Sequence, residues 1–323
     1  MKEVTVEEVL ERSEAYGFDL EAVTGSLGMD RLIYEARIQK PGLALAGFTY
    51  HLHPGRVQIL GETEITFFLN LPENERAPAA RNLCVEGLSC LVVTKGLDVP
   101  VELCAEVASF GIPVLRSALS SSQFIDKITS FLEDRLAERT SLHGVLIDVL
   151  GIGILLLGKS GIGKSECALD LVVRGYRLVA DDIVEVQKKP PSSLIGSGLE
   201  LIKHHMEIRG LGIINVKDLF GIAAIRETKK IELVIELVEW RNEEEYDRLG
   251  FDETSYSILN VTLPMIRLPV RPGRNITTII EVAARNHLLK VMGHNSALEF
   301  QRRLTRQIAE TSEGVTTFGN EVE

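Results

Sequence analysis

The chain has 323 residues, enough for about two domains with buried cores, and its 45% apolar and 25% charged content is ordinary for a globular protein. The net charge is −11: residues 1–133 carry 11 basic and 19 acidic side chains, and residues 134–323 carry 24 and 27. Neither half has the basic stripe of a nucleic-acid-binding protein, which excludes nucleic acid as the expected partner.

The sequence also argues against a membrane or secreted protein. The first residues lack the basic segment and apolar core of a signal peptide. The most apolar stretch, 144–158, is interrupted by Asp148 and is too short to span a bilayer. The four cysteines form no Cys-x-x-Cys pair, so we expect reduced, mostly buried thiols. These features predict a cytoplasmic protein.

The first half alternates between predicted strands and helices. The expected elements are a capped helix at 5–16, a strand at 56–61, a helix at 62–70, a strand at 88–94, a helix at 99–110 and a strand at 112–115. This order favours a small α/β domain with a parallel sheet. No catalytic constellation is visible in it, and the role of this domain is not readable from its residues.

A predicted helix at 123–138 connects the two halves. Three serines precede it, and its apolar residues recur with a helical period at Phe124, Ile128, Phe131, Leu132 and Leu136. We place the domain boundary near residue 133, which gives domains 1–133 and 134–323.

The second half is predicted to be mixed α/β, with more strands per helix than a doubly wound fold. Strands are expected at 145–150, 152–157, 177–182, 183–187, 231–240, 257–263 and 265–270, and helices at 166–174, 277–292 and 296–310. The fold class of the whole chain is therefore α/β.

A phosphate-binding loop lies between the strand at 152–157 and the helix that follows. It has the pattern Gly, four residues, Gly-Lys-Ser, and consists of Gly158, Lys159, Ser160, Gly161, Ile162, Gly163, Lys164 and Ser165. Glycines let successive N–H groups point at anionic oxygens, and the helix N-terminus adds its dipole. We expect Lys164 to reach the terminal phosphates and the Ser165 hydroxyl to ligate Mg²⁺.

Two adjacent carboxylates, Asp181 and Asp182, follow a strand shortly after this loop. An acidic strand end near a phosphate loop can hold Mg²⁺ or activate the attacking group. Neighbouring side chains on a strand point to opposite faces, so only one of the two should face the phosphates directly. The alternative is a solvated strand end.

Two further segments are weaker signals when each is taken alone. Glu207, Arg209 and Gly210 form a bend that suits either a phosphate or metal site or a structural turn. Arg271 and Arg274 lie on a Pro/Gly loop that could clamp an oxyanion or be an ordinary surface loop. By the same reasoning His143 is an ordinary turn histidine, and Arg248 lies on a solvated helix face.

Together, four segments resemble the family of the bifunctional HPr kinase/phosphorylase, which acts on HPr, the phosphocarrier protein of the bacterial sugar phosphotransferase system. They are GKSGIGKSE at 158–166, LVADD at 178–182, EIRGLGIINV at 207–216 and PVRPGRN at 269–275. Their order and spacing match the family from His143 to Asn275, and the rest of the chain fits its layout with weaker signals. The agreement of four motifs is far more specific than the phosphate loop alone.

The resemblance implies a carboxykinase-like nucleotide core, a hexamer, and the use of ATP, Mg²⁺, inorganic phosphate and pyrophosphate. It implies that Asp182 exchanges the proton of the target serine, and that Ser165 and Glu207 hold Mg²⁺. The implied catalytic residues are His143, Lys164, Asp182 and Arg248, and the further site residues are Arg209, Gly210, Arg271 and Arg274. Lys159 adds a second cation beside the phosphates, which either favours anionic ligands or points to solvent.

Two other functions remain open on the sequence. One is a phosphate-loop kinase of a small metabolite, or a carboxykinase-like enzyme, which would turn over without any protein substrate. The other is a non-catalytic nucleotide sensor, whose output would survive the loss of Asp182.

Overall fold

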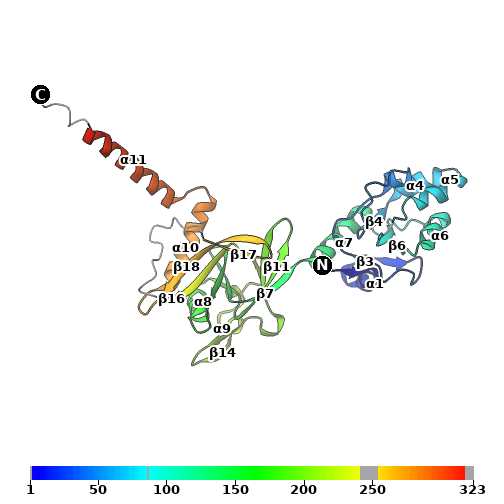
Figure 1. Cartoon of the computed structure of the whole chain (residues 1–323). Helices are drawn as coiled ribbons and strands as arrows, with labels where there is room; N and C mark the ends of the chain where they lie inside the picture. The colour runs from blue at the N-terminus through cyan, green and yellow to red at the C-terminus, as the bar shows by residue number, and fades with distance from the viewer. Residues whose placement is uncertain (1, 86, 241–253, 317–323) are drawn as a thin grey trace. The chain divides into compact units, whose positions relative to one another are not determined.

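The computed structural model describes residues 2–85, 87–240 and 254–316. The chain divides into two compact units, Met1–Glu138 and Arg139–Glu323 (Figure 1). Each unit contains its own apolar clusters of buried residues. Each is therefore described by itself.

The first unit is built around a small, mainly parallel sheet. In chain order it contains β1 (Val4–Thr5), α1 (Val6–Glu11), α2 (Ser13–Tyr16), β2 (Leu20–Ala22), β3 (Leu32–Ile33), α3 (Gly42–Leu45), β4 (Val57–Leu60), α4 (Glu62–Asn70), α5 (Glu73–Arg81), β5 (Cys90–Val93), α6 (Val101–Ser109), β6 (Val114–Ser117) and α7 (Ser121–Leu136). The strand order is β2-β6-β5-β4, with β4, β5 and β6 parallel and β2 antiparallel to β6. This confirms the predicted parallel sheet.

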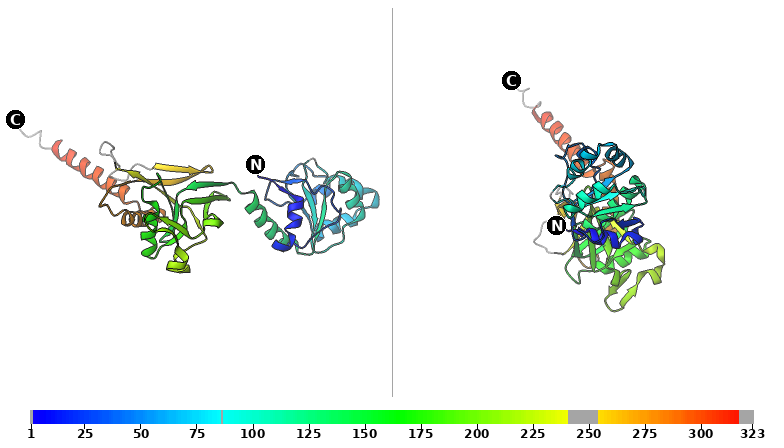
Figure 2. Two further views of the ribbon diagram at one scale, coloured as in Figure 1. Left: turned by 90° about the horizontal axis from the view of Figure 1, so that it is seen from below. Right: turned by 90° about the vertical axis from the view of Figure 1, so that its right-hand side faces the viewer.

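Helices cover both faces of this sheet, as the left view of Figure 2 shows for α1 (blue) and the helices drawn in cyan. One apolar cluster packs α1 and α7 against one face of the sheet. A second cluster packs α3, α4, α5 and α6 against the other face. Helix α7 begins at a capping box between Ser120 and Gln123. Its buried residues Phe124, Ile128 and Phe131 include those whose spacing predicted it.

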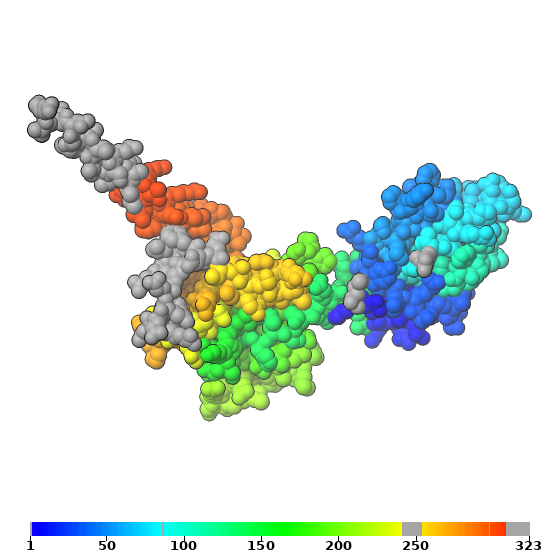
Figure 3. All heavy atoms as spheres, viewed as in Figure 1, coloured from blue at the N-terminus to red at the C-terminus, as the bar shows by residue number. Residues whose placement is uncertain are grey.

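The second unit contains two packed sheets and four α-helices among its described residues. In chain order its elements are β7 (Arg139–His143), β8 (Val145–Val149), β9 (Ile152–Gly158), α8 (Lys164–Val173), β10 (Arg177–Ala180), β11 (Ile183–Lys189), β12 (Ser193–Gly198), η1 (Glu200–Ile202), β13 (His205–Ile208), β14 (Gly212–Asn215), α9 (Val216–Phe220), η2 (Ile222–Ala224), β15 (Thr228–Lys230), β16 (Leu233–Glu239), β17 (Thr254–Ile258), β18 (Val261–Val270), α10 (Ile276–Val291) and α11 (Ser296–Thr316). The described start of α11 is orange-red in Figure 3, and its side chains at 298–307 are exposed.

The larger sheet has six strands in the order β10-β8-β9-β16-β18-β17. Strands β9, β16 and β18 are parallel neighbours. Strand β8 is antiparallel to both β9 and β10, so β10 runs in the same direction as β9. One face packs against α8 and α10, and the other packs against the four-stranded sheet β15-β12-β11-β7. The sheet is mixed, as predicted.

The predicted bounds of two neighbouring strands, 257–263 and 265–270, were wrong. The expected strand at 257–263 contains a hairpin turn, because Leu259 and Asn260 both have positive φ, 48° and 61°. Strand β18 instead runs on through Pro264 and Pro269. Among the described residues, Pro264 pairs with Ser255 of β17 and Pro269 pairs with Val238 of β16, so each proline has one described partner strand.

No helix among residues 2–85, 87–240 and 254–316 is long and apolar enough to cross a membrane.

Candidate active site

Four strands of the larger sheet, β9, β10, β16 and β18, end at the same edge because they run in one direction. The phosphate loop follows β9, and the two aspartates follow β10. Trp240 follows β16, and Arg271 follows β18. In α/β sheets, ligands bind outside the carboxyl ends of the strands. The topology thus gathers residues that lie far apart in the sequence.

The phosphate loop is closed by glycine geometry. Gly158 has φ 143°, and a Cβ atom there would lie 2.5 Å from the carbonyl oxygen of Leu237 on β16. Gly163 has φ 102° and is the N-cap of α8. The Lys164 ammonium donates to the carbonyl oxygens of Gly158 at 3.0 Å and Lys159 at 3.1 Å. The cation is therefore held at the loop.

Arg209 lies directly against this loop. A Cβ atom built on Gly161 would be 2.7 Å from Nη2 of Arg209. The arginine comes from the bend between β13 and β14, where Gly210 and Gly212 have φ 84° and 92°. Neither residue spacing nor periodicity indicated this contact between two distant motifs.

The two aspartates have different environments. Asp181 is 6% exposed, and its carboxylate accepts a hydrogen bond from the Ser165 hydroxyl at 2.9 Å. Burial raises the pKa of Asp181, while hydrogen bonds from Ser165 and from the backbone N–H groups of Glu207 and Asp182 oppose that shift. Asp181 was not among the predicted site residues, although strand alternation had indicated that only one of the pair would face the loop.

Asp182 is the exposed member of the pair. It has φ 67°, a conformation that non-glycine residues adopt rarely and that recurs at functional sites. Its carbonyl oxygen accepts from Gly144 N at 2.9 Å, and its Oδ1 lies 3.8 Å from Nδ1 of His143. Strand β7 brings His143 there, since His143 pairs with Ile183 of β11. Both side chains are open to an incoming substrate, 83% and 74% exposed.

The oxygen donors at this edge fit Mg²⁺ better than a softer metal. The Ser165 hydroxyl and the Asp181 carboxylate are already in contact, and Glu207 is exposed on β13, with its backbone N–H near enough to Asp181 to lower the pKa of that carboxyl. The described parts of the chain contain no cluster of three or more His, Cys, Asp or Glu side chains placed to hold a metal ion. Mg²⁺ usually keeps few protein ligands and completes its shell with phosphates and water.

The loop after β18 is held by its own contacts. Arg274 donates to the carbonyl oxygen of Pro269 at 3.1 Å, and the Arg271 guanidinium stacks 5.0 Å from the ring centre of Trp240. At the neighbouring strand end, the Lys159 ammonium lies 4.0 Å from Glu239 and is 72% exposed. Lys159 therefore points to solvent and to β16.

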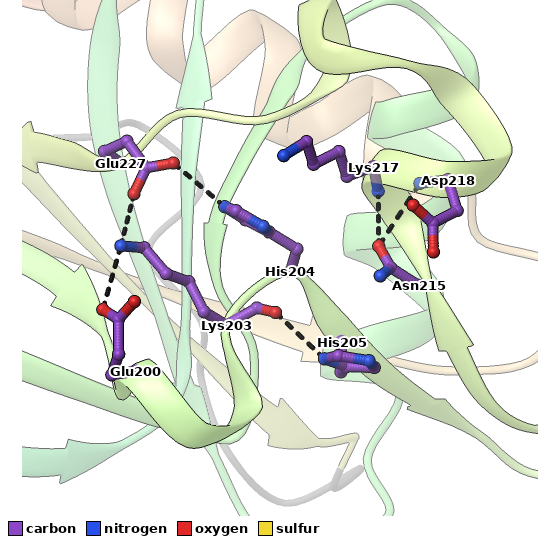
Figure 4. A network of polar contacts seen from close by, with 8 residues as sticks. All are labelled: Glu200, Lys203, His204, His205, Asn215, Lys217, Asp218 and Glu227. Atoms are coloured by element: carbon purple, nitrogen blue, oxygen red, sulfur yellow. Dashed lines mark hydrogen bonds and ion pairs between the residues drawn. The ribbon is translucent and has the colours of Figure 1, made fainter.

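A polar network lies at the base of the β13–β14 hairpin (Figure 4). Lys203 and His204 precede β13, and both contact Glu227, which precedes β15. Lys203 also contacts Glu200. On the other side of the base, Asn215 caps α9 by accepting from the N–H groups that follow it. Asn215 belongs to the segment 207–216, but Glu200, Lys203, His204 and Glu227 belong to none of the sequence motifs, so their contacts were not predicted.

Comparison with known proteins identifies the chain. The family model for the HPr Serine kinase N terminus matches residues 4–132, and the model for the HPr Serine kinase C-terminal domain matches residues 134–304. An HPr kinase/phosphorylase of Geobacter sulfurreducens is 56% identical over 320 residues, covering 99% of this chain and 98% of the relative. The chain belongs to the HPr kinase/phosphorylase family.

Two further known proteins are also similar to this chain. An HPr kinase/phosphorylase of Bacillus pumilus is 45% identical over 313 residues, covering 97% of this chain and 99% of the relative. A solved structure titled as the Hpr(Ser) kinase/phosphatase from Coxiella burnetii is 35% identical, with a TM-score of 0.46, and covers 50% of this chain and 98% of that one.

Most of the residues predicted for an HPr kinase/phosphorylase site lie at the shared edge of the sheet or on the hairpin beside it. Contacts link Ser165 to Asp181, His143 to Asp182, and Arg209 to Gly161. Arg271 and Arg274 form a separate turn at the end of the neighbouring strand. Arg248 lies outside the described residues, so its catalytic role stays a prediction.

Proposed function

We propose that this protein transfers the γ-phosphoryl group of ATP to a serine of the phosphocarrier protein HPr, with pyrophosphate as a possible second donor. In the reverse reaction it transfers the group from phosphoserine to inorganic phosphate, giving pyrophosphate. The observation that carries the proposal is the 56% identity to an HPr kinase/phosphorylase over 99% of the chain. Such a pair of reactions would regulate carbon metabolism.

In the forward direction, the serine hydroxyl attacks the γ-phosphorus in line as the bond to ADP breaks. Asp182 takes the hydroxyl proton, for which its exposed carboxylate beside the loop is well placed. Lys164 and the N–H groups of the loop offset the negative charge on the transferring group. His143, 3.8 Å from Asp182, is the nearest candidate to influence its proton.

In the reverse direction, inorganic phosphate occupies part of the same loop and attacks the phosphorus of phosphoserine. The bond to the serine oxygen breaks, and Asp182 returns a proton to that oxygen. Microscopic reversibility requires the same group to act in both directions. We assign Arg271 and Arg274 to this direction, because a Pro/Gly loop with two guanidinium groups can hold an additional anion.

Magnesium would bind through Ser165 and Glu207, with the buried Asp181 as a further ligand or as the group that orients Ser165. When bound, it would supply charge neutralisation for the phosphates. The oxygen chemistry of these side chains supports this assignment, and so does the existing Ser165–Asp181 hydrogen bond.

We also propose a domain type, an oligomeric state and a cellular location for this protein. The core of residues 134–323 is a phosphate-loop kinase domain of the carboxykinase-like type, and residues 1–133 are a separate domain of unassigned role. The protein assembles as a hexamer. It works in the cytoplasm, where thiols stay reduced, and its four cysteines are all free.

The deciding experiment follows a label through both reactions. The protein is incubated with HPr, Mg²⁺ and γ-labelled ATP, and inorganic phosphate is then added. We expect label to enter a serine of HPr and to leave as pyrophosphate. Unlabelled HPr together with retained ATP binding would reject the proposal, and turnover of small acceptors with ATP alone would favour a metabolite kinase.

A further inference from the structure

The β13–β14 hairpin holds two groups at the phosphate loop. The backbone N–H of Glu207 on β13 lies close enough to the Asp181 carboxylate to lower its pKa, and that carboxylate accepts a hydrogen bond from the Ser165 hydroxyl. The bend of the hairpin places Arg209 against Gly161. A shift of the hairpin would therefore disturb both the loop and the Ser165–Asp181 pair.

The hairpin has little backbone support of its own. Among the strands that the structure describes, β13 and β14 pair only with each other, and an isolated two-stranded hairpin is marginally stable in water. Met206 and Val216 are buried in the core of the unit, whereas Leu211 and Ile213 are 67% and 75% exposed. Ile208 and Ile214 also pack, partly buried, against that core, so apolar packing holds one face of the hairpin and polar contacts at its base add to this support.

Those contacts converge on Glu227 (Figure 4). Its Oε1 lies 3.2 Å from Nε2 of His204, and its Oε2 lies 2.5 Å from Nζ of Lys203. The His204 and Lys203 side chains are only 13% and 24% exposed. The hydrogen bond between Lys203 and Glu227 raises the pKa of Lys203 and lowers the pKa of Glu227, as expected for a close pair of opposite charges.

The backbone of His204 links this network to the hairpin. His204 has φ 65°, a left-handed conformation that must be held by its surroundings, and its carbonyl oxygen accepts from Val216 N at 2.8 Å. That bond closes the base of the hairpin. Glu227 directly precedes β15 of the four-stranded sheet, so the network ties the hairpin to a rigid part of the unit.

We propose that Glu227 is a positioning residue. Through His204 and Lys203 it fixes the hairpin, so that the Glu207 N–H stays near Asp181 and Arg209 stays on the phosphate loop. The inference rests on the proposed function for its effect on catalysis. Its effect on the hairpin is independent of any substrate.

Glu200 provides a matched control. It also contacts Lys203, at 3.1 Å, but its described contacts do not include His204. We compare Glu227→Gln with Glu200→Gln. For Glu227→Gln we expect kcat for HPr phosphorylation to fall about tenfold, the usual scale for loss of an outer support. The melting temperature should change by less than about 2 °C, and Glu200→Gln should behave like the parent.

Hydrogen exchange measures the hairpin directly. The Val216 amide, which donates to the His204 carbonyl oxygen, should exchange faster in Glu227→Gln than in the parent or in Glu200→Gln. His204→Gln, whose amide nitrogen can reach the position of the imidazole Nε2 that contacts Glu227, should retain most activity, and His204→Leu, with the same cost in the left-handed backbone, should lose it. Unchanged exchange at Val216 in Glu227→Gln, or equal activity of the two His204 variants, would overturn the inference. An inactive parent with the expected exchange pattern would overturn the proposed function alone.

Discussion

The hydroxyl of Ser165, in the first turn of α8, donates a hydrogen bond of 2.9 Å to the carboxylate of Asp181, just beyond the end of β10. The side chain of the next residue, Asp182, is exposed and lies beside His143. Two adjacent aspartates are thus separated by environment, one buried against the loop and one open to substrate. We infer that the buried carboxylate organises the site and the exposed one exchanges the proton.

The first prediction concerns this exposed carboxylate. Asp182→Asn should abolish both phosphorylation and phosphorolysis, since an amide cannot accept the serine proton, with a loss of at least about 10²-fold in kcat. ATP affinity, measured by calorimetric titration, should stay close to that of the parent. An active Asp182→Asn protein would contradict the base assignment.

The buried carboxylate predicts a pH dependence of stability. The folded-state pKa of Asp181 is raised by burial, so its contribution to the free energy of unfolding is fully present below the ordinary aspartate pKa. That contribution is lost as the pH rises through the folded-state pKa. With metal removed by chelator, the melting temperature of the parent relative to Asp181→Asn should therefore fall as the pH rises from about 4. If the melting temperatures of the parent and of Asp181→Asn changed in parallel with pH, this interpretation of Asp181 would be contradicted.

Gly161 tests the contact between the two motifs. Gly161→Ala should displace the Arg209 guanidinium, because the new Cβ would lie 2.7 Å from Nη2, and ATP affinity should fall about tenfold or more. Gly175→Ala is the matched control. Gly175 also has positive φ, 94°, but its Cβ would meet no atom within 4 Å. Both variants should lose about 1–2 kcal/mol of stability from backbone strain, and only Gly161→Ala should lose affinity in titrations with ATP.

The loop after β18 predicts a difference between the two directions. Arg271→Met or Arg274→Met should depress phosphorolysis several-fold more than phosphorylation, because the reverse reaction must bind an additional phosphate anion. Arg267→Met is a suitable control, since Arg267 lies on the same strand but pairs with Glu236. Rates of both reactions should be measured with the same protein preparation. Equal losses in the two directions would argue against a role for the loop in one of them.

The sequence predicted the elements whose patterns are strong. The helix α7 and the strands β8 and β9 follow directly from apolar periodicity and capping, and the phosphate loop follows from its glycines. The short strands β7, β12 and β15 were not predicted as strands, because they are largely polar and owe their pairing to tertiary contacts.

The site was predictable only in part, for a physical reason. Motifs identify residue types but not which side chains meet, so the contact of Arg209 with Gly161 and the approach of His143 to Asp182 appear only in the fold. Asp181 is buried while the adjacent Asp182 is exposed with a left-handed backbone, and the sequence did not indicate which of the two would face the loop. Glu227 belongs to no motif, and its role follows from its contacts alone.

The common edge where β9, β10, β16 and β18 end has a consequence for how such a site can change over generations. Each loop is attached to its own strand, and the strands are fixed by a shared core, so a substitution in one loop leaves the others in place. The residues that would bind the nucleotide and those that would recognise the acceptor can therefore evolve independently. The β13–β14 hairpin is the exception: it contacts both the phosphate loop and Asp181, so its residues are the least free to vary.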